Sequence, residues 1–246
     1  MRFFENALYR VPAVLIAMVL HECAHGYVAY RLGDPTAKMA GRLTLNPIRH
    51  LDPVGALMLF FLGFGWARPV PVNPRYFKRL HRDDFLVSIA GITTNLLIFL
   101  VCMLFGIWVN SLLWDPRVLQ DNPIRELLGF NSDITAYILL GYGTELKEWF
   151  VRPELLPVLR LLLQIAMINL YIALFNLLPI PPLDGSHVVN DILFKQNLFV
   201  QRHVAQLGTA ALLVLSFTGY LGKVLTFLAT GVQNGLFGLL AWIGGL

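Results

Sequence analysis

Long apolar stretches alternate with polar stretches along the chain, and four of the apolar stretches are long enough to cross a bilayer as helices. A spanning helix needs about 20 predominantly apolar residues. The four spans that we predict are about 7–32, 85–114, 155–180 and 207–230. Two shorter apolar stretches, 54–67 and 231–246, are expected to be re-entrant or interfacial. The pattern therefore predicts an all-α polytopic membrane protein that forms a single transmembrane domain over 1–246.

Composition agrees with a protein whose main surroundings are the lipid bilayer. Of the 246 residues, 57% are hydrophobic and 14% are charged, whereas a soluble domain carries about 25% charged residues. The net charge of +4 fits basic loops at the membrane surface. Lys and Arg do not cluster with aromatic residues, so we expect no nucleic-acid partner. Cys23 and Cys102 both lie in predicted spans and do not indicate a disulfide framework.

The distribution of Lys and Arg predicts how the spans are oriented. Region 31–84 holds nine basic and four acidic residues, while region 115–154 holds four basic and seven acidic residues. Cytoplasmic loops carry an excess of Lys and Arg, so 31–84 is expected in the cytoplasm and 115–154 on the far side. The last turn of the first span and the end of span 155–180 then face the cytoplasm together.

The first predicted span carries three ionisable residues, His21, Glu22 and His25, in the pattern H-E-x-x-H. Positions i and i+4 share a helix face, so the two imidazoles can bind one ion. Glu22 lies about 100° round the helix and can act as a base without being a ligand. The alternative is a pair of hydrogen-bonded helix histidines with no metal. The cost of ionisable groups within a membrane favours the functional interpretation.

A third ligand is needed, because two histidines do not complete a zinc site. Asp184 is the candidate, since the predicted orientation places it on the same side as the end of the first span. Pro179, Pro181 and Pro182 precede it and cannot continue an ordinary helix. A carboxylate on such a broken segment can reach sideways to a metal. The alternative is a helix-breaking surface loop in which Asp184 is solvated.

These motifs together resemble the site-2 protease family of intramembrane zinc metalloproteases. The matching segments, in family order, are His21–His25, Asn46-Pro47, Asp52–Gly55, Pro69–Asn73, Ser88–Gly91 with Asn95, and Asn176 followed by Leu183–Gly185. Ile92 stands where many members have proline, which concerns only the local helix geometry. Region 115–154 is too short for a PDZ domain and the tail too short for a CBS pair. The chain is thus similar to compact bacterial or archaeal members.

The resemblance implies specific roles for the residues of these motifs. His21, His25 and Asp184 would bind one Zn²⁺ per chain, and Glu22 would be the general base. Asn176 would hydrogen-bond the substrate backbone or the developing oxyanion. A short β-hairpin or edge strand near 40–55 would capture an unwound substrate by strand addition. The expected location is a bacterial or archaeal cell membrane, with the active site toward the cytoplasm.

The predicted function is that of an intramembrane zinc metalloendopeptidase that cuts transmembrane proteins or peptides within or near their spans. The alternative is a non-proteolytic membrane metal-binding protein, such as a transporter or a scaffold. Glu22 separates the two, because hydrolysis requires a base beside the metal and transport does not.

Other polar residues receive structural interpretations. Asn95 is expected to pack or to hydrogen-bond between helices. His187 is interpreted as a surface or capping residue, with a partner of a metal ligand as the alternative. His50, His81 and His203 lie in polar stretches and are expected to be solvated.

Overall fold

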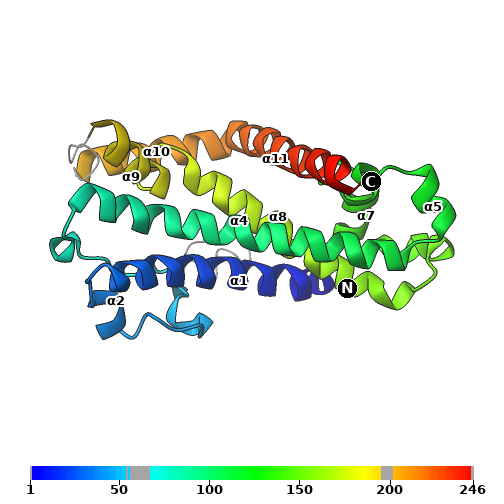
Figure 1. Cartoon of the computed structure of the whole chain (residues 1–246), viewed down its shortest axis with the longest axis horizontal. Coiled ribbons are helices and arrows are strands. Elements are labelled where there is room, and N and C mark those ends of the chain that lie inside the picture. Colours follow the sequence, from blue (N-terminus) through cyan, green and yellow to red (C-terminus); the bar gives the residue numbers. More distant parts are fainter. Residues whose placement is uncertain (1, 54, 56–66, 195–201, 245–246) are drawn as a thin grey trace. The chain divides into compact units, whose positions relative to one another are not determined.

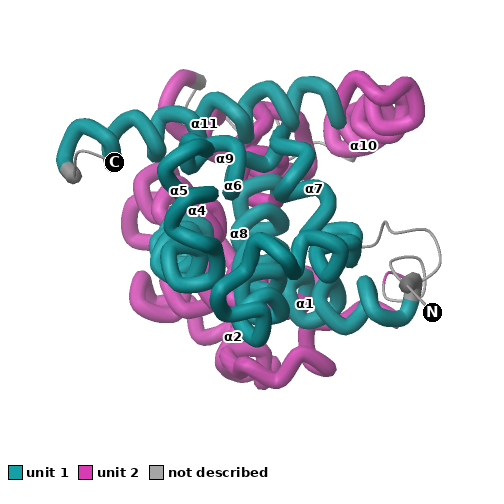
Figure 2. Tube along the Cα trace, turned by 90° about the vertical axis from the view of Figure 1, so that its right-hand side faces the viewer, with its two compact units in different colours: residues 1–14, 97–171, 222–246 teal, residues 15–96, 172–221 magenta. Residues whose placement is uncertain are grey.

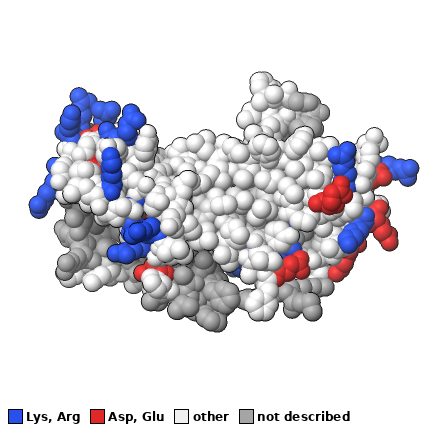
Figure 3. Space-filling model, turned by 90° about the horizontal axis from the view of Figure 1, so that it is seen from below, with Lys and Arg blue, Asp and Glu red and all other residues white. Residues whose placement is uncertain are grey.

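The computed structural model describes residues 2–53, 55, 67–194 and 202–244, and these are mostly helical (Figure 1). Among the described residues, four helices are long and apolar enough to cross a membrane. They are α1 (Arg2–Arg31), α4 (Leu80–Leu113), α8 (Leu156–Leu177) and α11 (Tyr220–Gly244). On the face drawn in Figure 3, a broad stretch of surface carries no charged side chain, as expected for helices that contact lipid. The prediction of an all-α polytopic membrane protein is confirmed.

The chain divides into two compact units, and both draw on the four long helices (Figure 2). Unit 1 comprises residues 1–14, 97–171 and 222–246, and unit 2 comprises residues 15–96 and 172–221. The prediction of a single domain over 1–246 stays a prediction.

Unit 1 contains the short helices of the acidic region. They are α5 (Pro116–Asp121), α6 (Ile124–Leu128), α7 (Asp133–Leu140), and the 3-10 turns η3 (Gly143–Trp149) and η4 (Pro153–Leu155). Gln233 of α11, only 3% exposed, accepts a hydrogen bond from the Phe130 N–H and donates one to the Leu128 carbonyl. Buried Arg160 of α8 pairs with Glu5 at 2.7 Å. These contacts satisfy hydrogen-bonding groups of Gln233 and Arg160 inside this unit.

Unit 2 contains the remaining short elements. They are α2 (Thr36–Met39), η1 (Pro47–Arg49), η2 (Pro74–Tyr76), α9 (Asp184–Val189), η5 (Asn190–Phe194) and α10 (Arg202–Phe217). Fully buried Asp34 accepts hydrogen bonds from the backbone N–H groups of Thr36 and Asn73. These bonds tie the loop after α1 to the segment that leads into α4.

The C-terminal helices differ from the sequence prediction. We expected one span over 207–230 and a re-entrant or interfacial tail over 231–246, but α10 ends at Phe217 and α11 runs from Tyr220 to Gly244. Gly219 lies between them with φ +74°, a left-handed conformation that commonly ends a helix. Hydropathy could not locate this boundary, because Gly219 lies within a stretch that is apolar on average.

The β-hairpin or edge strand expected near 40–55 is absent from the described residues. After α2 ends at Met39, this part of the chain forms η1 and turns, and one isolated antiparallel bridge joins Leu51 to Ala67. Asn46 instead caps η1 by accepting the Ile48 N–H, because Asn followed by proline favours a turn over a strand. The re-entrant segment predicted over 54–67 lies almost wholly outside the described residues.

The Gly219 boundary generates a prediction about stability. Gly219→Ala forces an L side chain into the left-handed region and should lower the free energy of unfolding by about 1 kcal/mol. Gly222→Ala is the matched control, because a Cβ there meets no atom within 4 Å and alanine favours the helix. Unfolding of both variants in detergent, followed by circular dichroism, measures the difference. Equal stabilities for the two variants would contradict the prediction.

Candidate metal centre

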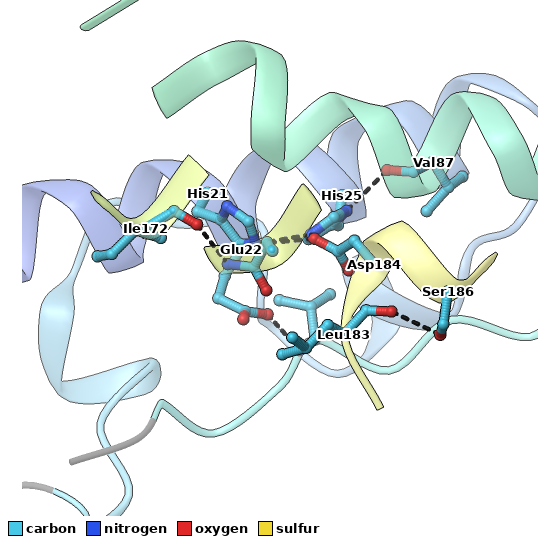
Figure 4. Close-up of polar contacts among 10 residues, drawn as sticks. His21, Glu22, His25, Val87, Ile172, Leu183, Asp184 and Ser186 are labelled. Atoms are coloured by element: carbon cyan, nitrogen blue, oxygen red, sulfur yellow. Dashed lines mark hydrogen bonds and ion pairs between the residues drawn. The ribbon is translucent and has the colours of Figure 1, made fainter. Parts of the chain in front are cut away.

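Two imidazoles from α1 and one carboxylate from α9 converge within unit 2. Figure 4 shows His21, His25 and Asp184 pointing toward one another. The Nε2 atoms of the two histidines are 3.0 Å apart, and each lies 3.2 Å from Oδ2 of Asp184. The histidines expose only 6% and 9% of their surfaces. Among the described residues, no other group of three such side chains has its ligand atoms this close together.

The donor set fits a zinc ion. Zinc bonds of about 2.0–2.1 Å in a tetrahedral site place neighbouring ligand atoms about 3.3 Å apart. The three separations of 3.0–3.2 Å are close to that value. Aspartate is ordinarily ionised at neutral pH, and the ionised form is the one that binds a metal.

The backbone of α4 sets the tautomer of His25. Nδ1 of His25 donates a hydrogen bond of 2.7 Å to the Val87 carbonyl oxygen. Nδ1 therefore carries the ring proton, and the lone pair of Nε2 faces the other ligand atoms. Nδ1 of His21 is also buried, and it has no hydrogen-bond partner among the described residues.

Two glycines allow the three elements to approach this closely. A Cβ on Gly91 of α4 would lie 2.5 Å from Cε1 of His21 and 2.5 Å from Nε2 of His25. A Cβ on Gly185 would lie 2.3 Å from the Leu177 carbonyl oxygen. Gly185 thus lets α9 turn back against the end of α8, which brings Asp184 to the histidines. Gly91 and Gly185 are therefore needed here, because a larger side chain would clash with its neighbours.

Glu22 is held beside the triad without belonging to it. Its Oε2 accepts a hydrogen bond of 2.7 Å from the backbone N–H of Val70. Asn176, in contrast, donates to the Ile172 carbonyl of its own helix at 3.1 Å. The structure thus brings together four of the five predicted site residues, and it gives Asn176 no hydrogen bond to the triad.

Several polar residues near the site differ from the sequence interpretation. The expectation that His50 is solvated was wrong, because it is 1% exposed and its Nε2 bonds the Thr44 carbonyl at 2.7 Å. Asn95 is fully buried, yet its amide atoms have no hydrogen-bond partner among the described residues. Arg42 is 7% exposed and was not singled out. Its position in a polar loop concealed its burial.

Two histidine–carboxylate pairs join the start of α4 to the region of α9 and η5. His81 contacts Asp191 at 3.0 Å, and His187 contacts Asp84 at 3.1 Å. The hydrogen bond to Asp84 raises the pKa of His187 above its usual value. His187 thus pairs with Asp84 of α4, a contact that the interpretation as a surface or capping residue did not include.

Gly91 generates a prediction for the metal centre. Gly91→Ala should lower the affinity for zinc by at least about tenfold, because the methyl group would push both imidazoles out of place. Gly106→Ala in the same helix is the control, since the nearest atom to its Cβ is 4.0 Å away. Zinc competition with a chelator of known affinity measures both variants. Unchanged zinc affinity in Gly91→Ala would show that the site tolerates displacement of the rings.

Comparisons with known proteins agree with this geometry. Residues 9–216 match the sequence model of the family described as "Peptidase family M50". The chain is 37% identical over 184 residues to "Putative zinc metalloprotease YwhC" of Bacillus subtilis, covering 75% of this chain and 68% of that protein. It is 27% identical over 235 residues to "Putative zinc metalloprotease Rip2" of Mycobacterium tuberculosis. The match covers 93% of this chain and 70% of that protein. No solved structure shows a significant match. The chain therefore belongs to peptidase family M50, the site-2 protease family, and is an intramembrane zinc metalloprotease.

Proposed function

We propose that this protease hydrolyses peptide bonds within or near the transmembrane segments of other membrane proteins, with His21, His25 and Asp184 holding one zinc ion per chain. The observation that carries the proposal is the convergence of these three ligand atoms beside Glu22. A spanning substrate helix hides its peptide bonds, so it must unwind locally before it can be cut.

Zinc in this position would polarise the scissile carbonyl and lower the pKa of the attacking water. Glu22 accepts the Val70 N–H at Oε2, which orients the carboxylate. Its Oε1 then takes a proton from water as the oxygen attacks the carbonyl carbon. The same carboxyl group returns this proton to the leaving amine nitrogen when the peptide bond breaks.

Asn176 is proposed to hydrogen-bond the substrate backbone or the developing oxyanion. Its Nδ2 carries two hydrogens. One of them can stay on the Ile172 carbonyl, where the structure has it, while the other binds substrate.

A non-proteolytic metal carrier or scaffold is not favoured. A metal carrier has no use for a carboxylate that lies beside the metal ligands but does not itself bind the ion. Glu22 occupies that position, and a backbone N–H fixes one of its oxygens. The zinc metalloprotease relatives agree with hydrolysis.

Glu22→Gln tests the proposed mechanism. Glutamine keeps the shape of the side chain and cannot take the proton from water, so kcat should fall by at least about 100-fold. Cleavage of a transmembrane model substrate by purified protein in liposomes measures kcat, and Glu148→Gln, an exposed site, is the control. Normal cleavage by Glu22→Gln would contradict the role of Glu22.

Bound zinc is measured on the same preparations. Glu22→Gln should retain one zinc per chain, whereas the zinc content of Asp184→Ala should be well below one per chain. Asp121→Ala, at an exposed position, is the control for a lost carboxylate. Unchanged zinc in Asp184→Ala would remove Asp184 from the ligand set.

We propose that the active site faces the cytoplasmic side of the cell membrane, because the basic region 31–84 is expected in the cytoplasm. An introduced cysteine at exposed Arg75 should react with an impermeant maleimide only after cells are permeabilised, because Arg75 lies in the basic region. Glu148→Cys, in the acidic region, should react in intact cells. Labelling of the unsubstituted chain corrects for Cys23 and Cys102. The opposite pattern would reverse the orientation.

A further inference from the structure

The backbone of residues 67–73 lies beside the site and is held by hydrogen bonds at Arg68 and Val70. Its sequence is Ala-Arg-Pro-Val-Pro-Val-Asn. The Arg68 N–H donates to the His50 carbonyl at 2.8 Å. The Arg68 carbonyl accepts a hydrogen bond from Nη2 of Arg42. The Val70 N–H donates to Glu22. This segment therefore connects Arg42 to the proposed general base.

Arg42 is unusual for an arginine in a loop, because it is 7% exposed. Burying a guanidinium is costly unless it binds specific partners. Burial and the charge of Arg68 lower the pKa of Arg42, while the charges of Glu22 and Cys23 oppose this change. An arginine side chain stays protonated at neutral pH even so. Arg42 is thus a buried cation whose guanidinium binds the Arg68 carbonyl.

The connection from Arg42 to Glu22 is short and stiff. Only Pro69 separates the Arg68 carbonyl from the Val70 N–H. The proline ring fixes its own φ, and proline also biases the preceding residue toward extended backbone. Residues 68 and 70 each precede a proline. A carbonyl held by Arg42 therefore fixes where the Val70 N–H lies.

We propose that Arg42 is a positioning residue for the general base: it anchors the Arg68 carbonyl so that the Val70 N–H holds Oε2 of Glu22 in place. This inference rests on the proposed function of Glu22. Without the guanidinium, the Arg68 carbonyl loses its partner and the Val70 N–H moves off the carboxylate. Glu22 then turns among rotamers and spends less time in the orientation that accepts a proton from water.

Arg42→Met tests this role, because methionine fills part of the buried space without donating a hydrogen bond. We expect kcat to fall by about 10- to 100-fold, the effect of a misplaced catalytic group. KM should stay within about twofold and zinc at one per chain, since Arg42 touches neither. Arg49→Met, on the same loop and exposed, should behave as wild type. Arg42→Lys should recover part of kcat, because its ammonium can donate to the Arg68 carbonyl.

Val70 provides a second test. Val70→Pro removes the N–H that Glu22 accepts, whereas Val70→Ala keeps it. Val70→Pro should lose as much kcat as Arg42→Met, and Val70→Ala should lose little. Because both substitutions break the same connection, the double variant should be no slower than Val70→Pro alone. Losses that multiply in the double variant would overturn the proposal.

Hydrogen–deuterium exchange reports on the contact without any turnover. The amide of residue 70 should exchange faster in Arg42→Met than in Arg49→Met or wild type. Equal exchange, or full kcat in Arg42→Met, overturns the proposal. If Arg42→Met does not fold, kcat and the exchange of the residue 70 amide are compared between Arg42→Lys and Arg49→Lys. Equal values in these two variants overturn the proposal.

The two proposals fail differently. Normal cleavage by Glu22→Gln would show that Glu22 is not the general base. An inactive Glu22→Gln together with a fully active Arg42→Met would leave the base in place and remove only the role of Arg42.

Discussion

Two imidazoles and one carboxylate meet among apolar helices, and the surrounding structure is arranged to keep them together. Neither a histidine nor an aspartate can be buried cheaply alone. His21 and His25 are buried, and each lies 3.2 Å from the Asp184 carboxylate. The contact joins residues more than 150 positions apart in the chain, so it holds α1 and α9 in one place within unit 2.

The neighbouring features follow from this contact. Gly91 leaves room for both rings, and Gly185 lets the chain return after α8. The Val87 carbonyl fixes the tautomer of His25. Segment 67–73 presents one N–H to Glu22 and one carbonyl to Arg42. In this arrangement α1 and α9 supply the three candidate ligands, and segment 67–73 contacts the proposed base.

Local rules recovered the elements that depend on local properties. The four long apolar helices exist because span length and hydrophobicity are local. The pairing of His21 with His25 follows from the helix repeat. Asp184 could be predicted as a ligand only by combining the orientation given by the loop charges with the need for a third ligand. The end of α10 escaped detection, because one left-handed Gly219 breaks an apolar stretch that hydropathy treats as continuous.

The sequence by itself determined the helical membrane class, the H-E-x-x-H face and the candidate third ligand, since these depend on composition and on spacing along one element. Tertiary structure alone decided that Glu22 meets the Val70 N–H, that Arg42 and His50 are buried, and that no hairpin forms near 40–55 among the described residues. The physical reason is that burial and backbone pairing depend on segments distant in sequence. An arginine in a polar loop looks solvated until the fold brings a backbone carbonyl to it and covers its side chain.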